Sequence, residues 1–239
     1  MKHIPNFITS LNLAAGFIAI IFAANGDMVT ASWLVFAAMI FDFLDGFSAR
    51  LLKAYSAIGR ELDSLADVVS FGVAPGLIIY QLLNDSLSLY APMIVNPDGL
   101  KASLIPIIPV IMPVCAALRL AIFNIDTTQA TTFKGLPTPA NALAVISVVL
   151  AGHYSQSTIF SSLTGSPILL IVFTVILSLM MVSRIPLLSL KFSNLKLKGN
   201  EGRYILAGLV LASFVIFGIK ASPLIIPLYI LASFLSLLF

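Results

Sequence analysis

The chain has 239 residues, of which 59% are hydrophobic and only 10% are charged, and its formal net charge is +3. Soluble domains carry about 25% charged residues, so this composition excludes a water-soluble globular protein and indicates an integral membrane protein. The single cysteine, Cys115, excludes an intrachain disulfide, and His3 and His153 are too far apart in sequence to indicate a histidine metal site.

Eight segments have roughly the 20 mostly apolar residues that a helix needs to span a bilayer. We therefore expect an all-α fold, a polytopic membrane helix bundle with about eight transmembrane helices. Between the third and fourth segments, residues 84–101 are expected to form an outer loop that contains Pro92 and Pro97. In chain order the eight segments cover residues 7–24, 29–52, 62–83, 103–123, 138–154, 166–186, 203–219 and 222–238.

The chain is expected to divide into three parts. Residues 1–186 would form a six-helix core, residues 187–202 a basic cytoplasmic linker, and residues 203–239 a C-terminal pair of transmembrane helices. The linker is rich in lysine and poor in apolar residues, so it would contact anionic lipid headgroups. The basic residues are spread over the loops with no pattern of stacking aromatics, which gives no reason to expect nucleic-acid binding.

The distribution of the basic residues predicts the orientation, because cytoplasmic loops carry an excess of lysine and arginine. With the N-terminus inside, eleven basic residues lie at or near the cytoplasmic side, and only Lys101 and Lys220 lie outside. We therefore expect a multi-pass protein of the cell membrane with both termini on the cytoplasmic side. The eleven are Lys2, Arg50, Lys53, Arg60, Arg119, Lys134, Arg184, Lys191, Lys196, Lys198 and Arg203.

Carboxylates are concentrated between Phe41 and Gly72, which hold five of the ten acidic residues. Four of them lie in apolar helices, where a carboxylate costs about 2.5–3.5 kcal/mol on insertion scales. Asp42 and Asp45 are three residues apart and Asp63 and Asp67 are four apart, so each pair shares one helix face. Oxygen-only ligands favour hard divalent cations, and two such ions commonly assist phosphoryl transfer. The alternative is that these aspartates form salt bridges with arginines.

Small and basic residues accompany the carboxylates. Gly46 and Gly59 remove side chains where a bulky ligand must approach the backbone, although glycine also serves helix packing. Arg50 can bind a diphosphate through charge-assisted bonds, and the Ser56 hydroxyl can contact the same ligand.

These residues together resemble one family signature. Asp42-x2-Asp45-Gly46-x2-Ala49-Arg50-x8-Gly59-x3-Asp63-x3-Asp67 resembles the complete signature of the CDP-alcohol phosphotransferases, and the resemblance covers residues 5 to 186. It implies a six-helix core, two divalent metals, Mg²⁺ or Mn²⁺, per active site, and a homodimer. It further implies that Asp42, Asp45, Asp63 and Asp67 bind metal and that Asp67 is the general base.

The same resemblance implies how the substrates are bound. Gly46, Arg50, Ser56 and Gly59 would hold the CDP-linked lipid. Asn6 and Thr9, in the run Pro5-Asn6-x2-Thr9-x2-Asn12, would reach the nucleotide or the diphosphate.

Three further segments resemble the integral-membrane phosphatidylserine synthases of this family: Asp63–Pro75, Cys115–Asp126 and Phe133–Ala142. The resemblance implies transfer of the phosphatidyl group from CDP-diacylglycerol to L-serine. We expect Arg119, Asn124 and Lys134 to frame the serine pocket. The alternatives are that the two cations are topological anchors and that Asn124 caps a helix end. One position departs from the family, because Ile122 stands where a second arginine is frequent.

Three alternatives to this function remain from the sequence. The same fold could use another acceptor, glycerol 3-phosphate or inositol phosphate, although a phosphate-bearing acceptor would favour a denser arginine cluster. An archaeal-type lipid donor is also compatible with the sequence. A divalent-cation transporter would instead space its acidic residues along a path through the bilayer, whereas here they are concentrated beside Arg50, Lys53 and Arg60.

Overall fold

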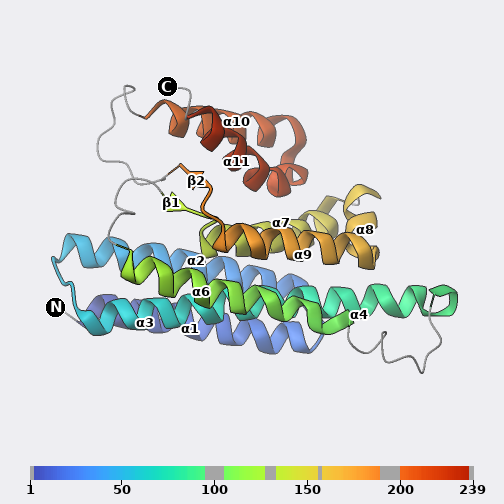
Figure 1. The fold of residues 1–239 in the computed structure, drawn as a ribbon, viewed down its shortest axis with the longest axis horizontal. Helices are drawn as coiled ribbons and strands as arrows, with labels where there is room; N and C mark the ends of the chain where they lie inside the picture. Colours follow the sequence, from blue (N-terminus) through green and yellow to red (C-terminus); the bar gives the residue numbers. More distant parts are fainter. Residues whose placement is uncertain (1–2, 95–104, 127–132, 156–157, 189–199, 237–239) are drawn as a thin grey trace.

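The structure is a computed structural model that describes residues 3–94, 105–126, 133–155, 158–188 and 200–236. Helices dominate it (Figure 1), and one short antiparallel strand pair joins β1 (Phe133–Lys134) to β2 (Pro186–Leu187). The prediction of an all-α polytopic membrane bundle is confirmed. Large apolar side chains such as Phe17, Val172 and Val215 are exposed on its surface, as lipid-facing residues are.

The first two helices form a tight antiparallel hairpin. α1 (His3–Ala24) and α2 (Met28–Leu51) are joined by a turn in which Gly26 has φ +84°. Asp27 caps α2, since its carboxylate accepts a hydrogen bond from the Thr30 amide at 2.9 Å. Small buried residues let the two backbones approach closely. These residues are Ala15, Ala19 and Ala23 on α1 and Ala31, Val35 and Ala38 on α2.

The third helical stretch is longer than the sequence predicted. It runs through α3 (Ala57–Asp67), a six-residue π-helix, η1 (Val68–Val73), and α4 (Ala74–Ile94). The prediction of a loop that begins at residue 84 is therefore wrong for residues 84–94, which are helical. Polar residues such as Asn84 and Ser86 lower the hydropathy without breaking a helix, and Leu87 still packs against the core.

The middle of the chain continues the bundle (Figure 1). A 3-10 turn, η2, leads into α6, and α7 follows the first strand. The most extensively buried helix is α7, with eleven buried residues. α8 and α9 meet at a bend of 87°. The bounds are Ile105–Val110 for η2, Ile111–Ile125 for α6, Thr138–Ser155 for α7, Thr158–Gly165 for α8 and Pro167–Val182 for α9.

The chain ends in a helical hairpin of α10 (Glu201–Phe217), η3 (Gly218–Leu224) and α11 (Ile225–Leu235). Gly218, with φ +59°, starts the reversal between the two helices, which lie side by side as an outer layer (Figure 1). α11 and η3 contact α7, and α11 contacts β2. Most of the predicted basic linker, residues 189–199, lies outside the described residues.

Fewer helices meet the length and hydropathy required for a membrane span than the sequence predicted. Within the described residues five stretches qualify, or six if the bent pair α8 and α9 counts as one span. The difference between eight and five has three sources. α10 and α11 count together as one stretch of 35 residues, and α9 qualifies only together with α8. α7 is not among the five, since its Asn141 and His153 lower the mean hydropathy.

Candidate active site

A cavity of about 490 Å³ lies at the end of the bundle where α1 begins, α2 ends and α3 begins. This end, at the left of Figure 1, also holds the N-terminus. Seven predicted site residues line the cavity, which are Asn6, Thr9, Asp45, Gly46, Ser56, Gly59 and Asp63. Pro5, Ala49, Ala54, Tyr55, Ala57, Arg60 and Glu61 complete the lining.

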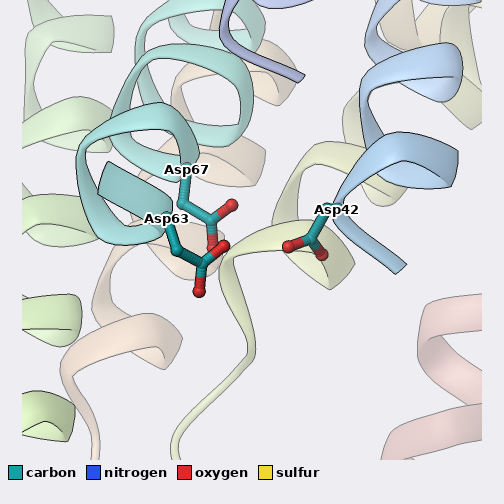
Figure 2. Close-up of side chains that lie close together, drawn as sticks. All are labelled: Asp42, Asp63 and Asp67. Carbon is teal, nitrogen blue, oxygen red and sulfur yellow. The ribbon is translucent and has the colours of Figure 1, made fainter. Parts of the chain in front are cut away.

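Three of the four predicted aspartates converge. One carboxylate oxygen from each of Asp42, Asp63 and Asp67 lies within 4.8 Å of the others. Figure 2 shows Asp63 and Asp67 projecting from one helix toward Asp42 on another. Asp45 is not in this group of three, but it is buried and lines the cavity together with Asp63. The carboxylates thus extend from the cavity into the bundle.

The carboxylates lack the partners that burial demands. Asp45 Oδ2 and Asp63 Oδ1 are buried without a hydrogen-bond partner, and among the described residues neither Arg50 nor Arg60 forms an ion pair with an aspartate. The salt-bridge alternative is therefore not what the described residues show. Unpaired buried carboxylates are costly, and a hard divalent cation with oxygen ligands would compensate them. The residues present fit such a metal.

A polar residue on α1 joins the cluster, and the sequence analysis assigned it no role. Asn12 is fully buried, and its Nδ2 donates to Asp67 Oδ1 at 3.4 Å. Its backbone oxygen accepts from Ser70 Oγ at 3.0 Å, and its Oδ1 is buried without a partner. The i, i+3, i+6 spacing of Asn6, Thr9 and Asn12 was the signal that all three share a helix face.

The π-helix η1 begins directly after Asp67. Asn141 of α7 is fully buried and donates through Nδ2 to the Phe71 carbonyl oxygen at 3.2 Å. This bond ties the wide turn to a neighbouring helix. Single π-helical turns occur frequently at functional sites, and this one follows the residue proposed as general base.

The two signature glycines have different surroundings. A Cβ on Gly59 would lie 2.8 Å from Asn6 Oδ1 and 2.9 Å from Ser56 Oγ, so Gly59 permits close approach of α3 to α1. Ser56 is the N-cap of α3, and its hydroxyl accepts from the Gly59 amide at 2.9 Å. A Cβ on Gly46 would meet nothing within 4 Å. Gly46 therefore borders open space in the cavity, whereas Gly59 serves helix packing.

The structure does not bring every predicted residue into the cavity wall. Arg50 lies exposed in the last turn of α2 and is not among the lining residues, whereas Arg60 is. Arg60 and Tyr55 are thus among the cavity residues that the sequence analysis did not assign to the ligand.

The predicted acceptor residues have three different environments. Arg119 on α6 is buried, lies 5.9 Å from the Phe123 ring centroid and interacts electrostatically with Asp67. Asn124 does not cap a helix end, since its Nδ2 donates to Ser64 Oγ of α3 at 2.9 Å. Lys134 pairs with Asp126 at 3.2 Å, and its side chain is 45% exposed. Ile122, at the position that departs from the family pattern, is exposed.

Comparison with known proteins gives a consistent result. The sequence model of the CDP-alcohol phosphatidyltransferases matches residues 2–180. The CDP-diacylglycerol–serine O-phosphatidyltransferase of Bacillus subtilis is 37% identical over 186 residues, which cover 77% of this chain and 89% of the relative. The enzyme of the same name from Helicobacter pylori is 34% identical over 240 residues, which cover 98% of this chain and 91% of the relative.

An archaeal relative differs in its name. The archaetidylserine synthase of Methanothermobacter thermautotrophicus is 34% identical over 155 residues, which cover 64% of this chain and 60% of the relative. With a matching sequence model over most of its length, and with the signature carboxylates gathered beside one cavity, the chain belongs to the CDP-alcohol phosphatidyltransferase family.

Proposed function

We propose that this protein transfers the phosphatidyl group from CDP-diacylglycerol to the hydroxyl of L-serine, which gives phosphatidylserine and CMP. Relatives similar over most of their own length are named for this reaction. The observation that carries the proposal is the cluster of Asp42, Asp63 and Asp67, of which Asp63 lines the cavity and Asp67 interacts electrostatically with the buried cation Arg119. This arrangement suits a diphosphate on one side and a carboxylate-bearing acceptor on the other.

The acidic cluster would hold the divalent metal, Mg²⁺ or Mn²⁺, with two ions per site. Asp42, Asp63 and Asp67 would bind it together with Asp45, whose Oδ2 is buried and without a partner. When bound, such ions neutralise diphosphate charge and polarise the phosphorus toward attack.

The chain's own residues position the donor. The CDP group would enter the cavity between α1, α2 and α3, where Gly46 leaves room for it. Asn6, Thr9 and Ser56 offer polar side chains along the wall, with Gly59 at the α1–α3 contact. Arg50 and Arg60, both exposed at this end of the bundle, would supply positive charge for the diphosphate.

Asp67 would act as the general base. The serine oxygen forms a bond to the phosphorus nearest the lipid, its proton passes to Asp67, and the bond from that phosphorus to the bridging oxygen breaks, so that CMP leaves with the electron pair. Asn12 holds one oxygen of Asp67 and would orient the other. Arg119 would bind the serine carboxylate, with Lys134 at the entrance. Direct attack requires no additional nucleophile.

We propose the cell membrane as the location, with the active site and both termini on the cytoplasmic side. The described cations Arg50, Lys53 and Arg60 lie at the same end of the bundle as the cavity, as the positive-inside rule requires. We further propose a homodimer, as the family resemblance implies. The mass of the purified protein in detergent, measured by light scattering, tests this point.

The decisive experiment uses purified protein in detergent with radiolabelled serine, CDP-diacylglycerol and Mn²⁺ or Mg²⁺. We expect label in the lipid fraction, stoichiometric release of CMP, and loss of both after chelation with EDTA. Incorporation of glycerol 3-phosphate or inositol phosphate in place of serine would contradict the proposed acceptor. Activity unaffected by EDTA would contradict the proposed metal site.

The lipid donor has a second candidate, because one relative is named archaetidylserine synthase. An isoprenoid ether lipid linked to CDP would use the same cavity and the same acceptor. Parallel assays with the acyl and the ether donor at equal concentration distinguish them. The higher kcat/KM identifies the preferred lipid.

A further inference from the structure

The π-helix η1 is tied to three different helices through three consecutive buried residues. Ser70 Oγ donates to the Asn12 backbone oxygen on α1 at 3.0 Å. The next carbonyl oxygen, that of Phe71, accepts from Asn141 of α7 at 3.2 Å. Gly72 packs so closely on α6 that an added Cβ would lie 2.9 Å from a side chain of that helix. Because π-turns are rare, these contacts, rather than local preference, account for the wide turn.

Asn12 joins this turn to the acidic cluster. Its backbone oxygen accepts from Ser70, and its side-chain Nδ2 donates to Asp67 Oδ1 at 3.4 Å. Two residues that lie three positions apart on the α3–η1 stretch therefore bond to a single residue of α1. Asn12, Ser70 and Asp67 are all buried, and hydrogen bonds are electrostatically stronger in such an interior than in water.

Gly16, one turn after Asn12, makes room for Ser70. A Cβ on Gly16 would overlap the Ser70 hydroxyl oxygen and lie 2.8 Å from Ser70 Cβ. The missing side chain thus lets α1 approach η1 closely enough for the hydroxyl to reach the Asn12 backbone. Two other buried serines, Ser86 and Ser147, donate to carbonyl oxygens three residues earlier in their own helices. The Ser70 hydroxyl instead connects two helices.

We propose that Ser70 is a positioning residue for Asp67. Its hydroxyl fixes η1 against α1 at Asn12, and Asn12 then holds the Asp67 carboxylate within the acidic cluster. Groups that orient the ligands of a metal matter to the site, and their loss typically lowers metal affinity or activity by about 10–100-fold. This inference rests on the proposed role of Asp67 as metal ligand and general base.

The test is Ser70→Ala in the protein purified in detergent. The electron paramagnetic resonance signal of free Mn²⁺ measures metal binding without substrates, and serine transfer is assayed at saturating Mn²⁺. We expect the dissociation constant for Mn²⁺ to rise about tenfold and kcat to fall about tenfold, because a displaced Asp67 serves poorly as ligand and as base. KM for serine and for CDP-diacylglycerol should stay within about twofold of wild type, since other residues bind both substrates.

Two controls separate positioning from a loss of stability. Ser86→Ala removes a buried hydroxyl that bonds within its own helix, and it should leave Mn²⁺ affinity and kcat unchanged. Asp27→Ala removes the N-cap of α2 at the opposite end of the bundle. It should lower the melting temperature about as much as Ser70→Ala does, with Mn²⁺ affinity and kcat as in the wild type.

A second variant approaches the same contact from α1. The methyl group of Gly16→Ala displaces the Ser70 hydroxyl, so Mn²⁺ affinity and kcat should fall at least as far as in Ser70→Ala. Gly208→Ala on α10, where an added Cβ meets nothing within 4 Å, is the matched control. In an Asn12→Ala background, Ser70→Ala should change Mn²⁺ affinity by less than about twofold, because the connection to Asp67 is already lost.

Three outcomes would overturn the inference: wild-type constants in Ser70→Ala, equal losses of Mn²⁺ affinity and kcat in Asp27→Ala, or full additivity of Ser70→Ala with Asn12→Ala. Absence of serine transfer by the wild-type protein would instead overturn the proposed function, and Mn²⁺ binding would still decide the role of Ser70. A wild-type protein that transfers serine but binds no Mn²⁺ would overturn the proposed metal site, and kcat would then decide.

Discussion

The proposed donor side and the proposed acceptor side of the site are built in different ways. The donor side comes from three consecutive helices, α1 to α3, and its signature residues lie between Asp42 and Asp67. Later elements provide the residues proposed for the acceptor side, which are Arg119 and Asn124 on α6 and Lys134 on β1. Local spacing thus groups the residues proposed for the donor, whereas tertiary packing, such as the hydrogen bond from Asn124 to Ser64, brings α6 to α3.

The two sides also differ in charge and in how their polar groups are satisfied. Buried oxygens without partners concentrate around Asp45, Asp63 and Asn12, which leaves capacity for a cation. Near the acceptor the buried charge is the guanidinium of Arg119. We therefore expect mutations on the two sides to affect different kinetic constants.

The largest effect is expected from Asp67→Asn on the donor side. Loss of the proposed base should lower kcat by about 10²–10⁴-fold, while binding of CDP-diacylglycerol changes little because the variant keeps the side-chain volume. Single-turnover assays and equilibrium binding of the nucleotide lipid measure the two quantities. Asp85→Asn, at an exposed position on α4, is the matched control, and a wild-type kcat for Asp67→Asn would remove its role as base.

Arg119→Lys should sharpen the comparison from the acceptor side. Lysine keeps the charge but loses the planar, bidentate geometry, so KM for serine should rise at least about tenfold with KM for CDP-diacylglycerol unchanged. Lys134→Met should have a smaller effect, about threefold, because its side chain is 45% exposed and paired with Asp126. Lys220→Met on η3 serves as the control. An equal rise of both KM values would break the division of the site.

The two glycines of the signature should separate stability from binding. Gly59→Ala places a methyl group 2.8 Å from Asn6 Oδ1 and should destabilise the protein by about 1–3 kcal/mol. Gly46→Ala meets no atom within 4 Å, so thermal stability should be unchanged while KM for CDP-diacylglycerol rises. Thermal melts in detergent with parallel kinetics test this pair. Identical behaviour of the two variants would contradict their different surroundings.

The smallest effect is expected where the two sides meet. Asn124→Ala removes the hydrogen bond to Ser64 between α6 and α3, which contributes about 1 kcal/mol. We expect a melting temperature lower by a few degrees and a loss of activity below about fivefold. If KM for serine rises as much as in Arg119→Lys, Asn124 contacts the acceptor directly.

The sequence predicts the features that depend on local spacing and misses those that depend on tertiary packing. Hydropathy predicted a helix in each of the eight ranges, and helical spacing predicted that Asp63 and Asp67 share a face, because both depend on local periodicity. The extension of α4 to Ile94 was missed, since polar residues in a helix resemble a loop in a hydropathy reading. The hydrogen bond from Asn124 to Ser64 could not be predicted, because no local spacing relates residues 60 positions apart.

The π-helix after Asp67 has a consequence for how the protein tolerates change. Each π-turn holds more than the 3.6 residues of an α-turn, so η1 shifts the rotational phase of α4 relative to α3. The direction in which the α3 carboxylates point is therefore independent of which faces of α4 contact lipid and which contact the core. Conversion of Val68–Val73 to ordinary α winding at constant length would rotate one half against the other by about 100°. A one-residue deletion that restored α winding would instead keep the two halves in nearly their present relation. The length of this segment and its winding are therefore coupled, even where side-chain identity is not constrained.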